Sequence, residues 1–420
     1  MKLLWLCNAV PGVVASQISG RETGAVNWVD HVLSDLRSRG QTICILCPGN
    51  GASGALDGLC SYQTYVEGRP DVYKPALEAQ FRQVLCAFQP DVIHIWGTEY
   101  GHTLAMVNAA QQEGLLPRLA VSIQGLCSVA ARHYAQGIPH TVRGRFTLRD
   151  FLRQDNIRQQ ARVFARRGAL EVEALKKVRH VIGRTEWDLA CTGQINPGRS
   201  YHFCSETLRE PFYAGCWAYE ACRKHRIFAP SCAYPVKGFH YLLEAFAQVL
   251  KVYPDATLAV PGKSFLRTDA KYRLRRGSYD KYLAKLVKQY GLQGKIEFLG
   301  KLSAEGMKAA NLSANVFVQP STIENSPNAL GEAMVLGVPC IASDVGGVTS
   351  LMTHGTEGFI YDSAAPYMLA HYICKVFAMG DKAEALGRAA RAHAQLTHDP
   401  ENNLEALLSI YEKLAGEGRP

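Results

Sequence analysis

The chain has 420 residues, of which 47% are hydrophobic and 20% charged, a composition typical of a folded globular protein and not of a disordered one. This length exceeds what a single ordinary core accommodates, so we expect more than one domain. The sequence has no apolar run of the roughly 18 residues that a membrane span requires.

The cysteine pattern and the N-terminus indicate a cytoplasmic protein. The 13 cysteines are scattered, and most lie inside apolar runs, as Cys7, Cys86 and Cys340 do. Such cysteines are typical of reduced, buried thiols and not of a secreted disulfide framework. The apolar run at the N-terminus is short and lacks the small-residue cleavage site of a signal peptide, so we expect it to form a buried strand.

The N-terminal half alternates short apolar runs with amphipathic stretches. Buried strands are predicted at residues 3–7, 42–47, 92–96, 119–123 and 178–183, and helices near residues 24–39, 75–88, 103–113 and 160–177. This alternation is typical of a parallel sheet that is covered by helices on both faces.

The alternation begins again in the C-terminal half. Strands are predicted at residues 226–230, 257–260, 296–299, 316–319, 340–342 and 358–361, and helices near residues 239–253, 279–290, 303–310, 328–336, 364–379, 382–395 and 400–415. Pro211 and Gly215 interrupt the pattern between the halves. We predict an α/β protein with two Rossmann-like, doubly wound domains that face a central cleft. The domains are residues 1–213 and 214–420, and the last helices are expected to pack back on the N-terminal domain.

Positive charge is concentrated in one segment of a chain whose net charge is +9. Residues 141–180 hold nine arginines and two lysines against two aspartates and two glutamates. One interpretation is a solvated helical face. The other is a surface, Arg143 to Arg179, that attracts anionic lipid headgroups or a phosphate-bearing acceptor. Nucleic acid is not an expected partner, because the segment has few aromatic residues for base stacking and no nucleic-acid-binding signature.

The most informative motif is Glu-Asn-Ser-Pro-Asn-Ala-Leu-Gly-Glu at residues 324–332, between a predicted strand and a predicted helix. Pro327 suits the first turn of that helix, where its missing N–H is not needed. The backbone N–H groups of Asn328, Ala329 and Leu330 are then expected to be free to bind a diphosphate.

The two glutamates of the motif flank this expected diphosphate site. Glu332, about two turns into the predicted helix, is placed to accept hydrogen bonds from a ribose diol. Glu324 precedes the helix and is left beside a sugar. Asn325 and Ser326 complete the predicted donor-binding turn. The alternative is an ordinary helix start with a solvated glutamate.

Two further loops are predicted at the same edge of the second sheet. Lys237 follows the first strand of the C-terminal half, in Tyr-Pro-Val-Lys-Gly at residues 234–238, where it can neutralise a diphosphate as a point charge. Gly346 and Gly347 follow the strand at residues 340–342, and glycine permits close approach of backbone there.

These motifs resemble those of the retaining glycosyltransferases of family 4, which have the GT-B fold. The resemblance covers essentially the whole chain. It is strongest between residues 237 and 362, through Pro-Val-Lys-Gly, Ile-Glu-Phe-Leu-Gly-Lys-Leu, Gln-Pro-Ser-Thr-Ile-Glu-Asn-Ser-Pro-Asn and Ala-Ser-Asp-Val-Gly-Gly. It implies transfer of a sugar from a nucleotide-diphosphate sugar to a saccharide hydroxyl, with retained configuration and with no metal or other cofactor.

The resemblance also implies roles for single residues. Glu324 contacts the donor sugar near the reacting centre, Lys237 holds the diphosphate, and Glu332 binds the ribose. Gly262 lines the donor site, and the loop at residues 299–302, which ends in Leu302, meets the base. Gly24 stands where the family has its glycine-rich donor loop.

The sequence departs from the family pattern at two positions. Cys232 stands where the family usually has an arginine, and Arg184 is a candidate to supply the missing phosphate contact. Gln124 stands where the family often has a histidine near the sugar. A glutamine can hydrogen-bond a sugar hydroxyl but cannot transfer a proton at neutral pH. We therefore predict Glu324, Lys237 and Gln124 as the catalytic set.

The segments Gln124-Gly125 and Tyr-Pro-Val-Lys-Gly at residues 234–238 resemble a branch of the family that makes capsule or exopolysaccharide. We therefore predict a saccharide acceptor, which can be lipid-linked. The basic segment separately predicts that this cytoplasmic enzyme can bind reversibly at the inner face of the cell membrane. Thr98, Glu99 and His102 follow a buried strand on the expected cleft side, and they are weaker candidates to touch the acceptor. His94, within that strand, is interpreted as a core histidine.

Other interpretations stay open. A nucleotide-sugar epimerase of the same fold would use the same donor motifs. A catalytically silent glycan- or lipid-binding partner is compatible with Gln124 and Cys232. A dehydrogenase would need the glycine-rich segment at residues 49–54, but that segment opens no helical pattern, and we predict a flexible loop. Cys44 and Cys47 have the spacing of a metal pair, but on a strand they point to opposite faces and no second pair is near.

Overall fold

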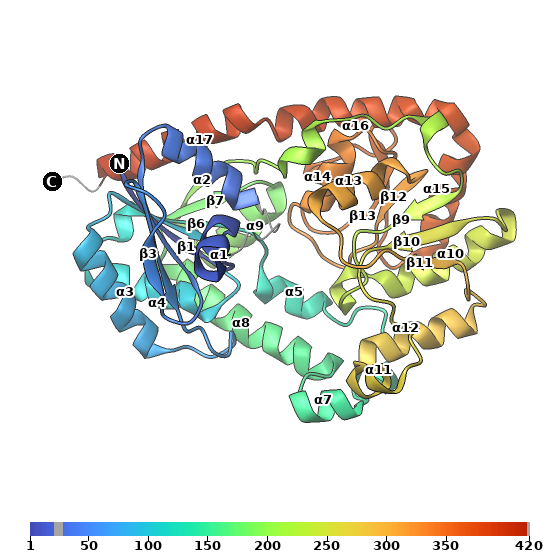
Figure 1. Cartoon of the computed structure of the whole chain (residues 1–420), viewed down its shortest axis with the longest axis horizontal. Coiled ribbons are helices and arrows are strands. Elements are labelled where there is room, and N and C mark those ends of the chain that lie inside the picture. Colours follow the sequence, from blue (N-terminus) through green and yellow to red (C-terminus); the bar gives the residue numbers. More distant parts are fainter. Residues whose placement is uncertain (21–27, 418–420) are drawn as a thin grey trace. The chain divides into compact units, whose positions relative to one another are not determined.

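The structure is a computed structural model that describes residues 1–20 and 28–417 (Figure 1). The chain forms two compact units. Unit 1 contains Met1–Ala131, Val163–Arg209 and His398–Pro420, and unit 2 contains Arg132–Arg162 and Glu210–Thr397. The chain thus passes from unit 1 to unit 2 near the predicted boundary at residue 213, but it also crosses at three other places. Gly24, a predicted donor-loop residue, lies outside the described residues.

Unit 1 is built on an eight-stranded sheet in the order β3-β4-β2-β1-β5-β6-β7-β8. Neighbouring strands run parallel except β3 and β4. The strands are β1 (Lys2–Cys7), β2 (Thr42–Pro48), β3 (Ser53–Ala55), β4 (Cys60–Tyr65), β5 (Val92–Trp96), β6 (Leu119–Ser122), β7 (His180–Gly183) and β8 (Ser200–Phe203).

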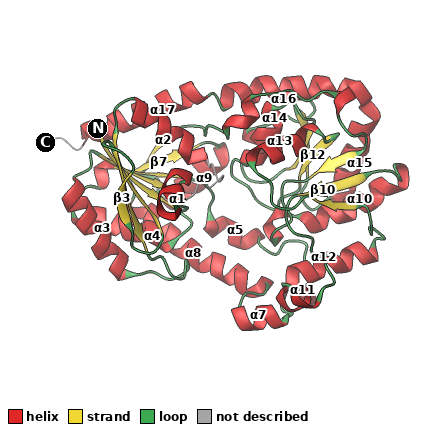
Figure 2. Ribbon diagram, viewed as in Figure 1, coloured by secondary structure: helices red, strands yellow, loops and turns green. Residues whose placement is uncertain are grey.

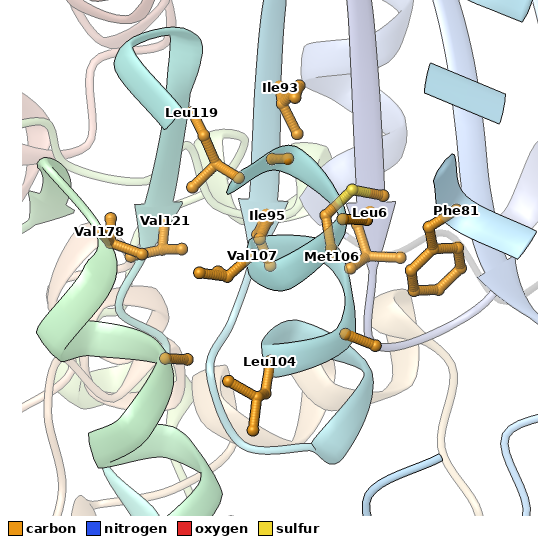
Figure 3. Close-up of a cluster of buried hydrophobic side chains, with 14 of the residues drawn as sticks. Leu6, Phe81, Ile93, Ile95, Leu104, Met106, Val107, Leu119, Val121 and Val178 are labelled. Carbon is orange, nitrogen blue, oxygen red and sulfur yellow. The ribbon is translucent and has the colours of Figure 1, made fainter. Parts of the chain in front are cut away.

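Helices cover both faces of this sheet because its central strands are apolar on both sides (Figure 2). In β1, Leu4 and Leu6 point into one core, and Leu3, Trp5 and Cys7 point into the other. The first core is closed by α3 (Pro75–Phe88), α4 (Gly101–Gln112) and α8 (Ile157–Lys177), and part of it is drawn in Figure 3. The second is closed by α1 (Gly12–Ser19), α2 (Trp28–Ser38) and α17 (Pro400–Glu417).

The final helix α17 is attached to unit 1 by buried hydrogen bonds as well as by apolar contacts. The Tyr411 hydroxyl accepts from Trp5 Nε1 at 3.1 Å and lies 2.6 Å from His94 Nδ1. His94 Nε2 lies 2.7 Å from the Ser122 hydroxyl, so both ring nitrogens have partners. Burial lowers the pKa of His94 to about 3, so the ring is neutral near pH 7. His94 is therefore a core histidine, as its place within a strand predicted.

Unit 2 contains a six-stranded parallel sheet in the order β11-β10-β9-β12-β13-β14. Its strands are β9 (Arg226–Phe228), β10 (Thr257–Val260), β11 (Ile296–Phe298), β12 (Val316–Gln319), β13 (Cys340–Ser343) and β14 (Gly358–Tyr361). Its longer helices are α10 (Phe239–Val252), α12 (Ser278–Gln289), α13 (Ala304–Leu312), α14 (Asn328–Val335), α15 (Pro366–Met379) and α16 (Ala383–Thr397).

The strands and helices predicted from periodicity are present in the described residues, and the elements that the sequence did not indicate are mostly short. They include β3, β4, β8, α1, α5 (Cys127–His133), α6 (His140–Arg143), α7 (Leu148–Arg153), α9 (Glu186–Ile195) and α11 (Ala270–Arg275). The flexible loop predicted at residues 49–54 is wrong in its last two residues, because Ser53 and Gly54 belong to β3 and pair with β4. No helix among the described residues is both long and apolar enough to cross a membrane.

The basic segment of the sequence is divided between the two units. Residues up to Arg162 belong to unit 2 and those from Val163 onward belong to unit 1. In unit 1, Arg166 pairs with Asp71 at 2.5 Å. Arg167 donates to the Glu99 carbonyl at 2.5 Å and lies over the Tyr100 ring. These two arginines therefore have structural partners within unit 1.

Candidate functional site

The strand order of unit 2 locates its candidate site. From β9, the chain builds β10 and β11 on one side and then β12, β13 and β14 on the other. The order therefore reverses between β9 and β12. In open α/β sheets, ligands bind at the carboxyl ends of the strands at such a switch point. Lys237 follows β9 and Glu324 follows β12.

Lys237 and Glu324 are in direct contact at this point. Lys237 Nζ lies 2.6 Å from Glu324 Oε1, and the side chains are 23% and 13% exposed. Burial by itself lowers the pKa of Lys237, but the charge of Glu324 outweighs it and raises that pKa above its ordinary value. Lys237 therefore carries its ammonium charge at neutral pH.

The hydrogen bonds of this pair leave part of each group available. Glu324 Oε1 also accepts from the Ser321 hydroxyl at 2.7 Å and from Gln319 Nε2 at 3.0 Å. Glu324 Oε2 has no partner among the described residues, and Lys237 uses one of its three N–H donors. One carboxylate oxygen and two ammonium protons can thus meet a ligand.

Two glycines let the loops around the pair approach closely. Gly238 has φ +63°, and a Cβ there would lie 1.7 Å from the Pro320 carbonyl oxygen. Gly346 has φ +55°, and a Cβ there would lie 1.7 Å from the Glu324 carbonyl oxygen. Gly347 N also donates to that oxygen at 3.2 Å. The close approach predicted for the 346–347 loop is thus to the Glu324 backbone itself.

Helix α14 begins at Asn328 directly after Pro327, with no side-chain cap. The N–H of Leu330 donates to the Pro327 carbonyl at 2.9 Å, so the expectation of a free N–H is wrong for Leu330. Glu332 lies four positions after Asn328, just over one turn into the helix and not two. The reason is that the helix begins only after the proline, and Glu332 is buried at 2% exposure.

The remaining donor-site candidates of unit 2 lie on neighbouring turns. Asn325 and Ser326 are buried between Glu324 and α14. Gly262 follows β10 with φ +107°, and its N–H donates to the Gly300 carbonyl at 2.6 Å. The half-exposed Leu302 follows in the same loop as Gly300. The structure thus brings the predicted base-contacting loop beside Gly262.

Cys232 does not replace the charge of the arginine that the family usually has at its position. The residue is 8% exposed, and burial raises the pKa of its thiol to about 12. A neutral thiol contributes no positive charge to a diphosphate site at pH 7.

Gln124 and Arg184 form a separate cluster in unit 1. They follow β6 and β7, and both contact Glu206: Arg184 as an ion pair and Gln124 through its amide nitrogen. Arg184 also donates to the Ile123 carbonyl at 3.1 Å. The three side chains line a small cavity of about 30 Å³, whose other lining residues include members of α2 and α17. Arg184, proposed as a phosphate contact, therefore has a carboxylate partner within its own unit.

The weaker acceptor candidates are occupied by other contacts. Thr98 is fully buried and donates to Glu171 at 3.0 Å. His102 lies between Glu67 Oε1 at 2.7 Å and Asn8 Oδ1 at 2.8 Å. Glu99 accepts from Asn8 Nδ2 at 2.6 Å, and burial raises the pKa of Glu99. Their acceptor role stays a prediction, and the geometry gives Thr98 and His102 structural partners.

Sequence reasoning missed the residues that hold the site in place. Gln319 and Ser321 fix the Glu324 carboxylate, and the Ser343 hydroxyl donates to the Ser321 carbonyl at 2.6 Å. The signal for Ser321 was its position three residues before Glu324 at the predicted strand end, from which its hydroxyl reaches the carboxylate. No local pattern indicated Glu206, because it is far from Gln124 in the sequence and contacts it only in the folded chain. In the described part of the chain, no three His, Cys, Asp or Glu side chains are grouped to hold a metal ion.

The C-terminal part of the chain is similar to a known protein family. Residues 224–393 match the model of the family described as "Glycosyl transferases group 1". The D-inositol 3-phosphate glycosyltransferase of Corynebacterium urealyticum is 26% identical over 184 residues, which are 43% of this chain and 41% of that protein. The chain therefore spans less than half the length of the curated relatives that it matches.

Solved structures confirm the predicted GT-B fold over the whole chain. Sucrose-phosphate synthase from Thermosynechococcus elongatus superposes with a TM-score of 0.71 at 16% identity and covers 99% of both chains. Anabaena HepE in complex with UDP-glucose superposes with a TM-score of 0.67 at 17% identity, over 98% of this chain and 99% of that one. At this level of identity the likeness concerns the fold alone.

Proposed function

We propose that the protein is a retaining glycosyltransferase that moves a sugar from a nucleotide-diphosphate sugar to a hydroxyl of a saccharide acceptor. The observation that carries this proposal is the Lys237–Glu324 pair at the switch point of the unit 2 sheet. In this proposal the ammonium would meet a diphosphate and the neighbouring carboxylate would meet a sugar. The match of residues 224–393 to the group 1 glycosyltransferases supports the same assignment.

The free donors and acceptors of the pair suit this chemistry. The two unused N–H donors of Lys237 would bind the diphosphate, with the start of α14 beside it, and Glu332 would bind the ribose. Glu324 Oε2 would accept from a sugar hydroxyl, while Ser321 and Gln319 hold Oε1. The carboxylate would therefore orient the donor sugar without having to move.

The proposed reaction is a front-face displacement. The acceptor oxygen forms a bond to the anomeric carbon as the bond from that carbon to the diphosphate oxygen breaks, and the proton of the acceptor hydroxyl passes to the departing diphosphate. Lys237 stabilises the negative charge that develops there, an electrostatic role that requires no metal. Gln124, held by Glu206, would hydrogen-bond a sugar hydroxyl.

The acceptor and the place of the reaction are a further part of the proposal. The resemblance of residues 234–238 and of Gln124-Gly125 to a capsule or exopolysaccharide branch supports a lipid-linked saccharide acceptor. An enzyme that uses such an acceptor would work in the cytoplasm at the inner face of the membrane.

Donor turnover by purified protein tests the proposal. Transfer or slow hydrolysis of a nucleotide sugar is expected from the wild type. Lys237→Ala and Glu324→Gln are expected to lose nearly all turnover while both variants stay folded. Wild-type turnover of Lys237→Ala with an unchanged donor KM would refute the assignment. Release of a second sugar from donor alone would instead identify an epimerase, and binding of a nicotinamide cofactor would favour a dehydrogenase.

A further inference from the structure

Helix α7 of unit 2 has its polarity reversed relative to a normal surface helix. Its apolar residues Leu148, Phe151 and Leu152 are 56%, 63% and 72% exposed, and Phe146 just before it is 50% exposed. The fully buried residue is Asp150. A short helix in a soluble protein ordinarily buries its leucines and phenylalanines and exposes its charges. Here the apolar side chains are directed to the outside.

Hydrogen bonds of the local structure hold α7 in this reversed orientation. The Thr147 hydroxyl accepts from Asp150 N at 3.1 Å, and Asp150 Oδ2 accepts from Thr147 N at 3.2 Å, which together cap the helix. Asp150 Oδ2 also accepts from Ser278 N at 2.9 Å at the start of α12. The buried aspartate therefore anchors α7 to unit 2 with its apolar side facing outward.

Basic residues are numerous in the two chain segments that form and adjoin this apolar surface. Residues 143–158 contain five arginines and two aspartates, and residues 267–288 contain eight basic residues and two aspartates. In the first segment, Asp150 is used by the cap and Asp155 is bound by Arg149 at 2.8 and 3.0 Å. The two aspartates of the first segment are thus occupied, while Arg145 and Arg153 are exposed.

The neighbouring helices extend the same combination of apolar and basic groups. Helix α11 packs against α7 and exposes Leu274 at 59%. Helix α12 contributes Lys281 and Lys285, which with Arg145 line a groove of about 280 Å³ whose other walls include Phe146 and Tyr282. Figure 1 shows α7, α11 and α12 close together in unit 2. We call the apolar side chains of Phe146, Leu148, Phe151, Leu152 and Leu274, with Arg145, Lys281 and Lys285, the α7 patch.

We propose that the α7 patch is a docking surface for an anionic phospholipid bilayer. Exposed apolar side chains can enter the acyl boundary of a bilayer, and the basic side chains around them can meet anionic headgroups. Both features are needed, because a few apolar side chains alone bind only weakly and basic residues alone are removed by salt. The proposal deepens the proposed function, since it would bring the enzyme to a lipid-linked acceptor, but the binding itself needs no donor.

Vesicle co-sedimentation of the full chain tests the proposal. Phosphatidylcholine vesicles with and without phosphatidylglycerol are compared for the wild type, for Phe151→Ser/Leu152→Ser and for Lys281→Glu/Lys285→Glu. The wild type is expected to bind the anionic vesicles more tightly than the neutral ones, and this binding is expected to weaken as the salt concentration rises. The vesicle partition coefficient of each double variant is expected to be about tenfold or more below that of the wild type.

Matched controls separate docking from general loss of structure. Val252→Ser/Leu396→Ser removes two other exposed apolar side chains of unit 2, at 63% and 76% exposure, and is expected to bind vesicles as the wild type does. The thermal shift caused by UDP or GDP measures the donor site separately and is expected to be the same in all these variants. Loss of vesicle binding with this shift intact supports the proposal independently of turnover.

Three results would overturn the proposal. The first is wild-type binding that is absent or equal for neutral and anionic vesicles. The second is full binding by Phe151→Ser/Leu152→Ser. The third is a change in oligomeric state of that variant with unchanged vesicle binding, which would assign the patch to contact with a second copy of the chain.

Discussion

Removal of the Lys237 ammonium is expected to weaken nucleotide affinity, whereas removal of the Glu324 charge is expected to leave that affinity unchanged or to strengthen it. Lys237→Ala removes the positive charge that would meet the diphosphate. Loss of one partner from such a charged contact costs about 2–4 kcal/mol, which corresponds to a roughly 30- to 1000-fold higher Kd. Glu324→Gln keeps the side-chain shape and frees the ammonium from its 2.6 Å partner, so the diphosphate affinity is expected to hold or rise.

The unfolding free energy of Lys237→Ala is expected to change much less than its nucleotide affinity does. The Lys237 and Glu324 side chains are 23% and 13% exposed, and Glu324 keeps its hydrogen bonds from Ser321 and Gln319 when Lys237 is removed. The loss in unfolding free energy from Lys237→Ala is therefore about 1 kcal/mol, after allowance for solvent screening. The difference between affinity and stability separates a binding role from a structural one.

Isothermal titration with UDP and GDP provides the assay, and thermal unfolding of each variant provides the folding check. Lys251→Ala is the matched control, because Lys251 is an exposed lysine of unit 2 that donates to Gln248. It is expected to leave the Kd unchanged. An equal loss of affinity in Lys237→Ala and Glu324→Gln, or wild-type affinity in Lys237→Ala, would refute the argument.

Three further predictions concern the loops and the core. Gly346→Ala places a Cβ 1.7 Å from the Glu324 carbonyl oxygen at φ +55°, and it is expected to cost about 3 kcal/mol or more of unfolding free energy and to weaken nucleotide binding. Tyr411→Phe leaves Trp5 Nε1 and His94 Nδ1 without their buried partner and is expected to cost about 2–4 kcal/mol. The unfolding free energy is expected to fall as the pH drops below about 6.5, by up to about 1.4 kcal/mol per unit from His94. The reason is that the pKa of His94 is lowered to about 3 in the folded protein, so the unfolded chain binds the proton first.

Each of these predictions has a control. Gly355→Ala carries similar backbone strain at φ +79° but meets no atom within 4 Å, so it is expected to cost only about 1–2 kcal/mol. Tyr367→Phe, at a residue 69% exposed, should leave stability unchanged. In His94→Gln, the dependence of the unfolding free energy on pH in acid is expected to be weaker by the contribution of about one proton. Equal costs for the two glycines, a neutral Tyr411→Phe, or an unchanged slope in His94→Gln would contradict the respective reasoning. Chemical denaturation at several pH values measures all three.

Much of the fold could be predicted because hydrophobic period is local information. The central strands are buried on both faces, so each appears in the sequence as a short apolar run, as Val316–Gln319 does. The elements that were missed, such as β3 and α7, are short and carry no such pattern. Helix α7 even buries an aspartate and exposes its leucines, because a contact with Ser278, far along the chain, determines which side faces inward.

The sequence by itself determined the two-sheet architecture and the position of Lys237 and Glu324 at strand ends, because both follow from local pattern and spacing. Only the tertiary structure decided that these two side chains touch, that Ser321 and Gln319 hold the carboxylate, and that Gly346 packs on its backbone. It also decided that residues 132–162 belong with unit 2 and the last helix with unit 1. These outcomes depend on contacts between residues far apart in the chain, whose partners no local pattern identifies.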